Sequence, residues 1–235
     1  MAPEFATLAR FLSTTTGSPM DPHRLVEVAA HAIPQASDCA VTLTPSSGSP
    51  RTVAHSSDVA FAVDAIQYAT RQGPCLDALE KHDIAVVDDL TTDRRWPDFA
   101  RRCTTETPVR SMLSVRLSLQ GRDRAALNLY AESPRRFEEL DVDVATVFAP
   151  FVALSVQSEL QERRVANLES ALQTNRQIGT AMGILMARRL VTSDQAFDLL
   201  REASQHLNRK LHDVAAEVTM TGTLPDLGGA ERHVE

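Results

Sequence analysis

The chain has 235 residues, 43% of them hydrophobic, and a formal net charge of −7. This length accommodates one large domain or two modest ones, and the apolar content is sufficient for a buried core. The negative net charge argues against a nucleic-acid-binding surface that is basic overall, although it is compatible with a local basic patch.

No basic N-terminal segment precedes a sustained apolar run, and no run of 18 apolar residues occurs. Neither a signal peptide nor a membrane span is therefore predicted. The three cysteines, Cys39, Cys75 and Cys103, are far apart and form no CxxC pair. This argues against a disulfide framework and a structural zinc site, and the histidines show no metal-ligand spacing. Together these features predict a cytoplasmic protein without a bound metal.

The first 150 residues mix short strands with helices. Residues 1–19 end in turn-forming residues and predict a flexible N-terminus. The patterns that follow predict a helix, a hairpin, a helix ended by Gly73, a strand, a short helix and a second hairpin, at residues 22–33, 39–56, 58–73, 83–90, 96–106 and 111–133. Because neighbouring strands follow one another directly, we expect an antiparallel sheet flanked by helices in an α+β domain.

From Phe137 onward the hydrophobic pattern is helical, and three helices joined by very short turns are predicted near the C-terminus. Thr192 and Gln195 form a capping-box pattern at the start of the second helix. Asn208 is expected to cap the third helix, and Gly222 to end it. Isolated helices of this length are marginal in water, so we expect them to pack on one another.

Small residues recur every four positions in the first of these helices, at Gly179, Gly183 and Ala187, with Ala181 between them. A helical glycine costs about 1 kcal/mol relative to alanine, so this stripe needs a reason. We expect close packing against the second helix, the third helix or a partner chain. Direct contact with a ligand is the alternative.

A glycine-free stretch, with Pro150 as its one proline, runs from Val147 to Leu172 and predicts a helix that connects the two halves of the chain. Its apolar residues recur at heptad-like spacing, at Phe151, Leu154, Val165, Leu168 and Leu172. This pattern is compatible with a short coiled coil between two copies of the chain. Before residue 160, packing of the helix on its own sheet explains the pattern equally well.

The segment "IGTAMGILMARRLVTSDQAFDLLREASQHLNRKLHDVAAEVTMTG" resembles the ANTAR domain, a three-helix RNA-binding module of bacterial transcription antiterminators. The resemblance implies a homodimer that binds two similar RNA hairpins in transcript leaders. The family has a lysine between the alanine and glycine of its "AKG" motif, where this chain has Met182. If that lysine touches an RNA phosphate, one contact is missing here. The matching positions are Ile178, Ala181, Gly183, Ile184, Leu185, Met186, Ala196, Phe197, Leu200, Arg201, Ser204, Asn208, Lys210, Leu211, Val214 and Ala215.

The RNA-binding residues implied by the resemblance are mostly basic. Between Ala166 and Gly222 six basic side chains balance six acidic ones, so bulk attraction to RNA is weak. The basic residues do cluster near turns, where arginine grips phosphates or stacks on bases. Solvated helix surface is the alternative interpretation of each one. The candidates are Arg176, Thr180, Arg188, Arg189, Arg201, Ser204, Asn208, Arg209 and Lys210.

The first half resembles the GAF domains that precede ANTAR domains, through "GPCLDAL", "DLTTDRRWPDF", "VRSMLSVRL" and "ALNLYAESPRRF". The resemblance implies a sensor of a small molecule or of redox state, without identifying the ligand or any cofactor. Cys75 is a candidate redox thiol, and a buried structural cysteine is the alternative. Asn128 belongs to a remnant of the cyclic-nucleotide pattern, in which Leu129 replaces the lysine. We interpret that remnant as fold residues.

The sequence therefore predicts an α+β GAF sensor domain followed by an all-α three-helix ANTAR domain. The expected boundaries are 1–19 for the N-terminus, 20–155 for the GAF domain, 156–172 for the connecting helix, 173–223 for the ANTAR domain and 224–235 for a flexible tail. The expected function is signal-responsive transcription antitermination. A DNA-binding regulator, or a dimeric signalling scaffold without nucleic-acid binding, is the alternative. No catalytic motif occurs, so an enzyme is not expected.

Overall fold

The computed structural model describes residues 21–80 and 84–225. The predicted flexible N-terminus, and the predicted tail beyond residue 225, lie outside these ranges. Contacts between Cα atoms divide the chain into two compact units, Met1–Gln161 and Glu162–Glu235. Among the residues described, no helix combines the length and apolarity that crossing a bilayer requires.

The N-terminal unit is built on a five-stranded antiparallel sheet, as predicted, with strand order β2-β1-β5-β4-β3. The two predicted hairpins are β1–β2 and β4–β5, which pair through β1 and β5 at the centre of the sheet. The strands are β1 (Asp38–Thr44), β2 (Arg51–His55), β3 (Ile84–Val87), β4 (Ser111–Leu117) and β5 (Arg124–Ala131).

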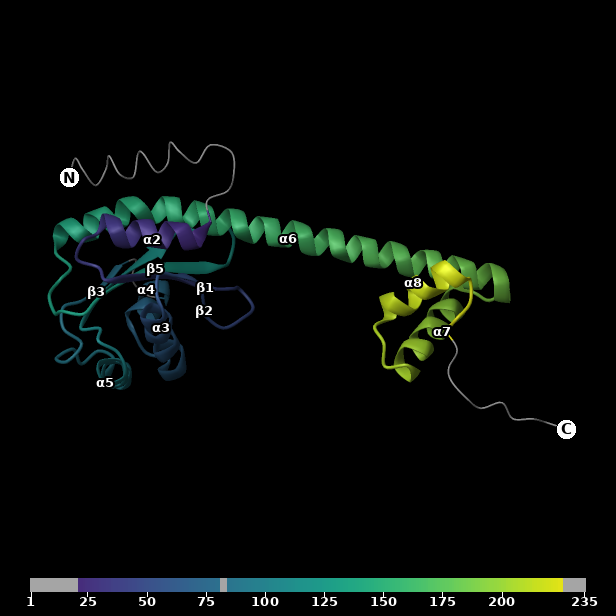
Figure 1. The fold of residues 1–235 in the computed structure, drawn as a ribbon, viewed down its shortest axis with the longest axis horizontal. Helices are drawn as coiled ribbons and strands as arrows, with labels where there is room; N and C mark the ends of the chain where they lie inside the picture. Colours follow the sequence, from purple (N-terminus) through teal and green to yellow (C-terminus); the bar gives the residue numbers. More distant parts are fainter. Residues whose placement is uncertain (1–20, 81–83, 226–235) are drawn as a thin grey trace. The chain divides into compact units, whose positions relative to one another are not determined.

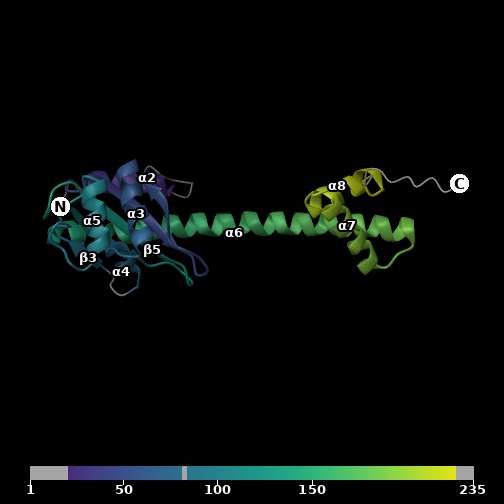
Figure 2. The same cartoon turned by 90° about the horizontal axis from the view of Figure 1, so that it is seen from below.

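The central strands bury side chains on both faces of the sheet. In β5, Leu127 and Leu129 point to one face, where α2 (Pro22–Ala32) and the start of α6 (Glu139–Arg189) cover them (Figure 1). Tyr130 points to the other face and packs with residues of α3 (Asp58–Thr70) and α5 (Pro97–Glu106). Figure 2 shows the sheet unit from the side of α3, α4 (Pro74–Glu80) and α5. Because side chains alternate along a strand, one strand supplies both cores.

Local signals define most of the helix ends. Ser57 caps α3 through its hydroxyl, which accepts from the Ala60 amide, and Pro97 occupies the first turn of α5. Gly73 was expected to end the helix of α3, but the helix ends earlier, at Arg71, whose φ of 55° is left-handed.

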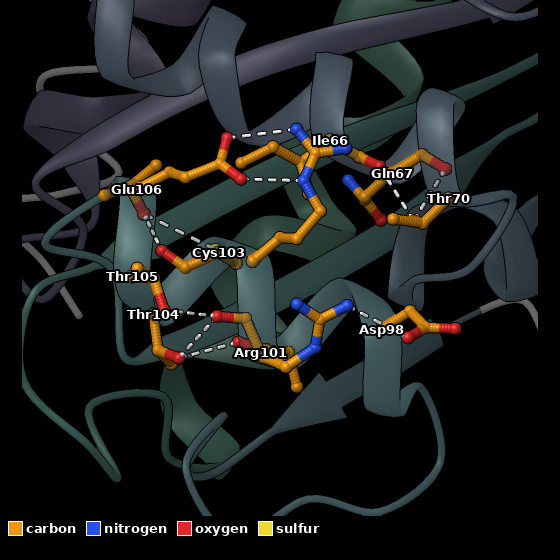
Figure 3. A network of polar contacts seen from close by, with 12 residues as sticks. Ile66, Gln67, Thr70, Asp98, Arg101, Cys103, Thr104, Thr105 and Glu106 are labelled. Atoms are coloured by element: carbon orange, nitrogen blue, oxygen red, sulfur yellow. Dashed lines mark hydrogen bonds and ion pairs between the residues drawn. The ribbon is translucent and has the colours of Figure 1, made fainter.

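Helix α4 was not predicted, because seven residues are too few to show a helical period. Figure 3 shows the contacts within α5, including the Arg101–Asp98 ion pair.

The C-terminal unit contains three helices: the last part of α6, then α7 (Ser193–His206) and α8 (Leu211–Thr221). Their core consists of small and branched side chains, Ala181, Leu185, Ala196, Leu200, Ala203, Val214, Ala215 and Val218. The predicted capping box at the start of α7 is present, since Thr192 accepts from the Gln195 amide and the Gln195 side chain accepts from the Thr192 amide. Gly222 ends α8 with a φ of 77°, as predicted.

The predicted cap of the third helix is wrong. The residue before α8 is Lys210, which makes no side-chain capping bond. Asn208 lies in the preceding turn with a φ of 49°. Asparagine tolerates this left-handed conformation better than most residues, so it helps the chain reverse direction between α7 and α8 instead of capping a helix.

The capping box yields a stability prediction. We expect Thr192→Ala to lower the free energy of unfolding of the C-terminal unit by about 1 kcal/mol, because the Gln195 amide loses its acceptor. Urea unfolding followed by circular dichroism measures this loss. Gln195→Glu is the matched control, because glutamate retains the capping box and should leave stability unchanged within error. Equal stability of Thr192→Ala and the wild type would contradict the prediction.

Candidate nucleic-acid interface and candidate sensor site

The basic pair that ends α6 has two different environments. Arg188 lies against the end of α8, since a Cβ built on Gly222 would be 2.6 Å from the Arg188 guanidinium carbon. A cation at this end of α8 complements the negative end of the helix dipole. Arg189 is exposed, and within residues 21–80 and 84–225 no hydrogen bond or ion pair involves its side chain. Arg189 is therefore the better placed of the two to contact a phosphate.

The second basic pair lies in the turn between α7 and α8. The Ser204 hydroxyl donates to the Arg209 carbonyl oxygen at 2.6 Å and fixes the turn. The Arg209 guanidinium donates to Glu217 at 2.6 Å, so α8 holds that side chain. Lys210 is exposed, and its ammonium makes no hydrogen bond or ion pair with any described residue. In this turn the charge of Lys210 is therefore available at the surface, whereas the charge of Arg209 is neutralised by Glu217.

The two basic pairs are not brought together. Arg188 lies at the end of α8 and Lys210 directly precedes its first residue, and α8 has 11 residues. A helix of that length spans about 16 Å, so Arg188 and Lys210 lie near opposite ends of α8. On α7, Arg201 is exposed and paired with Asp198 at 2.7 Å. The interface is a set of separate contacts instead of one concentrated patch.

Two further candidates lie on α6. Arg176 is exposed, and the Thr180 hydroxyl donates to the Arg176 carbonyl oxygen at 3.0 Å. Phe197 matches the family pattern but was not predicted to contact RNA, and it is 38% exposed on α7. It is the only Phe, Tyr or Trp after Phe151, which is the signal that could have identified it. An aromatic ring at such a surface is able to stack on an unpaired base.

The prediction for the small-residue stripe needs correction. Ala181 is buried in the three-helix core, but Gly179, Gly183 and Ala187 are exposed. A Cβ built on either glycine would meet nothing within 4 Å. Packing of the stripe against the second or third helix is therefore wrong, because Ala181 and Leu185 face those helices instead. Packing against a partner chain stays a prediction.

In the N-terminal unit, a buried carboxylate organises the sheet face beneath α3. Asp64 is fully buried and accepts hydrogen bonds from five side chains: Thr42, Thr52, Gln67, Asn128 and Tyr130. Burial raises the pKa of the Asp64 carboxyl above its ordinary 3.8, and the hydrogen bonds from Tyr130, Thr52 and Thr42 oppose that shift. The donors come from β1, β2, β5 and α3, so the carboxyl joins four elements.

Both candidate sensor residues belong to this interior. The Asn128 amide nitrogen donates to Asp64 at 3.1 Å and to the Thr42 hydroxyl at 3.0 Å, and its oxygen accepts from Ser114 at 2.9 Å. Cys75 is fully buried against Leu79 and Ala126. Burial, followed by the charge of Asp64, raises the pKa of the Cys75 thiol to about 12. A thiol in this state is mostly protonated and closed to solvent, as expected for the structural interpretation of Cys75.

A groove of this unit lies elsewhere, between the β4–β5 hairpin and α6. It has a volume of about 890 Å³ and includes Arg116, Arg124 and Gln157, but neither Cys75 nor Asn128 lines it. Among the described residues, no group of three His, Cys, Asp or Glu side chains is placed to hold a metal ion. The candidate sensor residues therefore form a packed polar interior.

An antiparallel sheet between two helical layers, followed by a three-helix unit, defines a two-domain protein. Family models match both parts: the GAF domain at residues 20–157 and the ANTAR domain at residues 166–218. Because the GAF match spans more than half of the chain, the protein belongs to the GAF domain family, with an ANTAR domain after the GAF domain. GAF domains are sensor domains and ANTAR domains are RNA-binding antitermination domains, so the general kind of function is regulatory.

Solved structures resemble the N-terminal unit at low sequence identity. The GAF domain of a phosphoenolpyruvate-protein phosphotransferase from Acinetobacter is 13% identical, with a TM-score of 0.51 over 68% of this chain and 96% of that one. Free methionine-R-sulfoxide reductase from Neisseria meningitidis is 17% identical, with a TM-score of 0.47 over 67% of this chain and 92% of that one. Likeness at this identity shows the fold alone. No curated protein matches the chain.

The burial of the cysteines yields a chemical prediction. All three, Cys39, Cys75 and Cys103, are buried free thiols whose pKa is raised by burial, that of Cys103 to about 11. We expect Ellman's reagent at pH 8 to detect no thiol in the folded chain and three after unfolding in guanidinium. A thiol that reacts quickly in the folded chain would contradict the burial and revive the redox interpretation.

The same shifts predict a loss of stability at alkaline pH. As the pH rises past the ordinary thiol pKa of 9.0, the unfolded chain releases thiol protons that the folded chain retains. The unfolded state then binds fewer protons, so the free energy of unfolding falls between about pH 9 and 12. Urea midpoints measured across this range test the effect. Cys75→Ala should make the decline shallower, whereas an unchanged slope would exclude Cys75 as a contributor.

Proposed function

We propose that this protein is a signal-responsive transcription antitermination regulator, in which the GAF domain senses a signal and the ANTAR domain binds paired RNA hairpins as a homodimer. The observation that carries the proposal is the ANTAR match over residues 166–218, together with exposed basic side chains on that unit. Dimers held by the connecting helix at residues 156–172 would place two RNA-binding units on two hairpins.

The distribution of charge favours hairpin loops over long duplexes. Lys210 directly precedes α8 and Arg189 ends α6, and both are exposed, while Arg201 and Arg209 each have an acidic partner. Such separated contacts suit a folded loop, in which backbone and bases present several faces at short range. A duplex-binding protein would need a helix with several base-reading side chains for the major groove. Helix α7 instead carries three acidic residues, Asp194, Asp198 and Glu202, which phosphates repel.

The signal would act on the polar interior around Asp64, which joins α3 to three strands of the sheet. In this proposal a ligand or a modification changes the packing of the GAF domain, and α6 transmits the change because it contributes residues to the cores of both units. The RNA-binding units then hold the two hairpins and prevent a terminator from forming. A small molecule is the proposed kind of GAF ligand.

The proposal predicts selective RNA binding. We expect filter binding to show that the full-length protein prefers a two-hairpin leader RNA over duplex DNA of matching sequence, and that scrambling either loop removes the preference. Lys210→Ala and Arg189→Ala should each weaken RNA binding several-fold. Each should also reduce the slope of log affinity against log salt by about 1, because one phosphate contact is lost.

A matched pair of variants controls for loss of surface charge. Arg201 pairs with Asp198 in the ANTAR domain, and Arg101 pairs with Asp98 in the GAF domain, both three residues apart on an exposed helix face. Such exposed pairs add little to stability, so both alanine variants should fold. Only Arg201→Ala should weaken RNA binding. Equal effects of the two variants, or equal affinity for RNA and duplex DNA, would contradict the proposal.

A further inference from the structure

The groove between the β4–β5 hairpin and α6 has no part in the proposed function. Its volume of about 890 Å³ is in the range of small-molecule sites. Val115 and Leu117 line the groove and belong to the apolar core beneath α2 and α6. The Asp64 network lies on the other face of the sheet, where Asp64 contacts Tyr130. The groove is therefore separate from the candidate sensor residues.

One part of the groove is apolar. Leu154 of α6 lines it and is 69% exposed, so its side chain offers apolar surface that a ligand can remove from water. Ile84, at the start of β3, lines it too and is 37% exposed. Between these exposed residues the lining also contains buried apolar side chains, which are Val115, Leu117, Ala149 and Ala153.

The hairpin end of the groove is basic. Its charged lining residues are Arg116, Arg122, Asp123 and Arg124, so three positive charges accompany one negative charge. The Asp123 carboxylate accepts a hydrogen bond from the Ser46 amide at 2.9 Å, which ties this hairpin to the β1–β2 hairpin. Arg122 and Arg124 are exposed, and their guanidinium groups make no hydrogen bond or ion pair with any described residue. Both are available to an anion.

A hydrogen bond fixes the two walls of the groove relative to each other. The Gln120 amide of the hairpin donates to the Gln157 side-chain oxygen of α6 at 2.9 Å. Gln157 is only 9% exposed, and both residues line the groove. The walls are therefore held in place without a ligand, which lowers the entropic cost of binding one.

We propose that this groove binds a small amphipathic anion, of the class of medium-chain acyl carboxylates. The carboxylate lies at Arg122 and Arg124, and the acyl chain lies along Leu154 and the buried apolar lining. The basic end and the apolar part together select a ligand that has both a charge and a chain. This site goes beyond the proposed function and does not depend on RNA binding.

A fluorescent acyl carboxylate tests the proposal on the full-length chain. Dansylaminoundecanoate emits more strongly in an apolar site, and we expect a saturable increase below its micelle concentration that decanoate reverses. Decanol has the same chain without the charge, so it is the matched control and should compete about tenfold less well. The absence of a saturable increase, or equal competition by decanoate and decanol, would overturn the proposal.

Paired arginine variants locate the charged end. Arg122→Gln and Arg124→Gln together should raise the dissociation constant of the probe about tenfold, because its carboxylate loses two charged donors. Arg94 and Arg136 are also exposed arginines of the GAF domain but do not line the groove. Arg94→Gln and Arg136→Gln together remove the same charge and should leave the constant unchanged within error. Equal effects of the two double variants would show general attraction to positive charge and contradict the proposal.

Paired leucine variants locate the acyl chain. Leu140 is 51% exposed on α6 and does not line the groove, so Leu140→Glu is the matched control for Leu154→Glu. Only Leu154→Glu should weaken binding, because its carboxylate removes an apolar contact and repels the anion. Equal weakening by both would place the probe outside the groove and contradict the proposal.

RNA binding by the wild type separates the two proposals. A chain that binds the probe in the groove but shows no preference for hairpin RNA would sustain this inference and sink the proposed function. RNA preference in a chain that does not bind the probe would do the opposite.

Discussion

The alternation of side chains along the central strands is the constraint on which the rest of the structure depends. Because β1, β4 and β5 bury residues on both faces, the sheet needs a helical layer on each side. The start of α6 is part of one layer, and its last turns contribute Ala181 and Leu185 to the three-helix core. One continuous helix thus contributes residues to two cores and covalently links the GAF domain to the ANTAR domain.

The two faces of the sheet differ in chemistry. The face beneath α2 and α6 is apolar, whereas the opposite face carries the Asp64 carboxyl and its donors. A buried carboxyl is costly unless its oxygens are satisfied, and here five side chains satisfy them. This requirement explains the presence of Asn128 and Tyr130 in β5, since both donate hydrogen bonds to the Asp64 carboxyl. A signal that rearranges this network would change contacts among four elements at once.

On the surface of the ANTAR unit, some basic side chains contact α8 and others are exposed to solvent. Arg188 lies against the end of α8 and Arg209 is paired with Glu217, while Arg189 and Lys210 are exposed. The apolar residues of α6 divide in a similar way. Val152 and Val156 are buried against the sheet, whereas Leu154, Val165, Leu168 and Leu172 are exposed. Although its basic and acidic side chains balance in number, the ANTAR unit therefore still exposes individual basic residues.

The sequence by itself determined the order of the elements other than α4, the antiparallel sheet, the capping box at Thr192 and the end of α8 at Gly222, because each depends on local periodicity or on one residue's backbone preference. It also determined the two families, through motifs spread over both halves. Only the tertiary structure decided that Gly179 and Gly183 are exposed and that Asn208 belongs to a turn, since a helix period does not say which face a neighbour covers. The burial of Cys75 and the five donors around Asp64 likewise come from residues distant in sequence, which meet only when the strands pair and the helices pack on them.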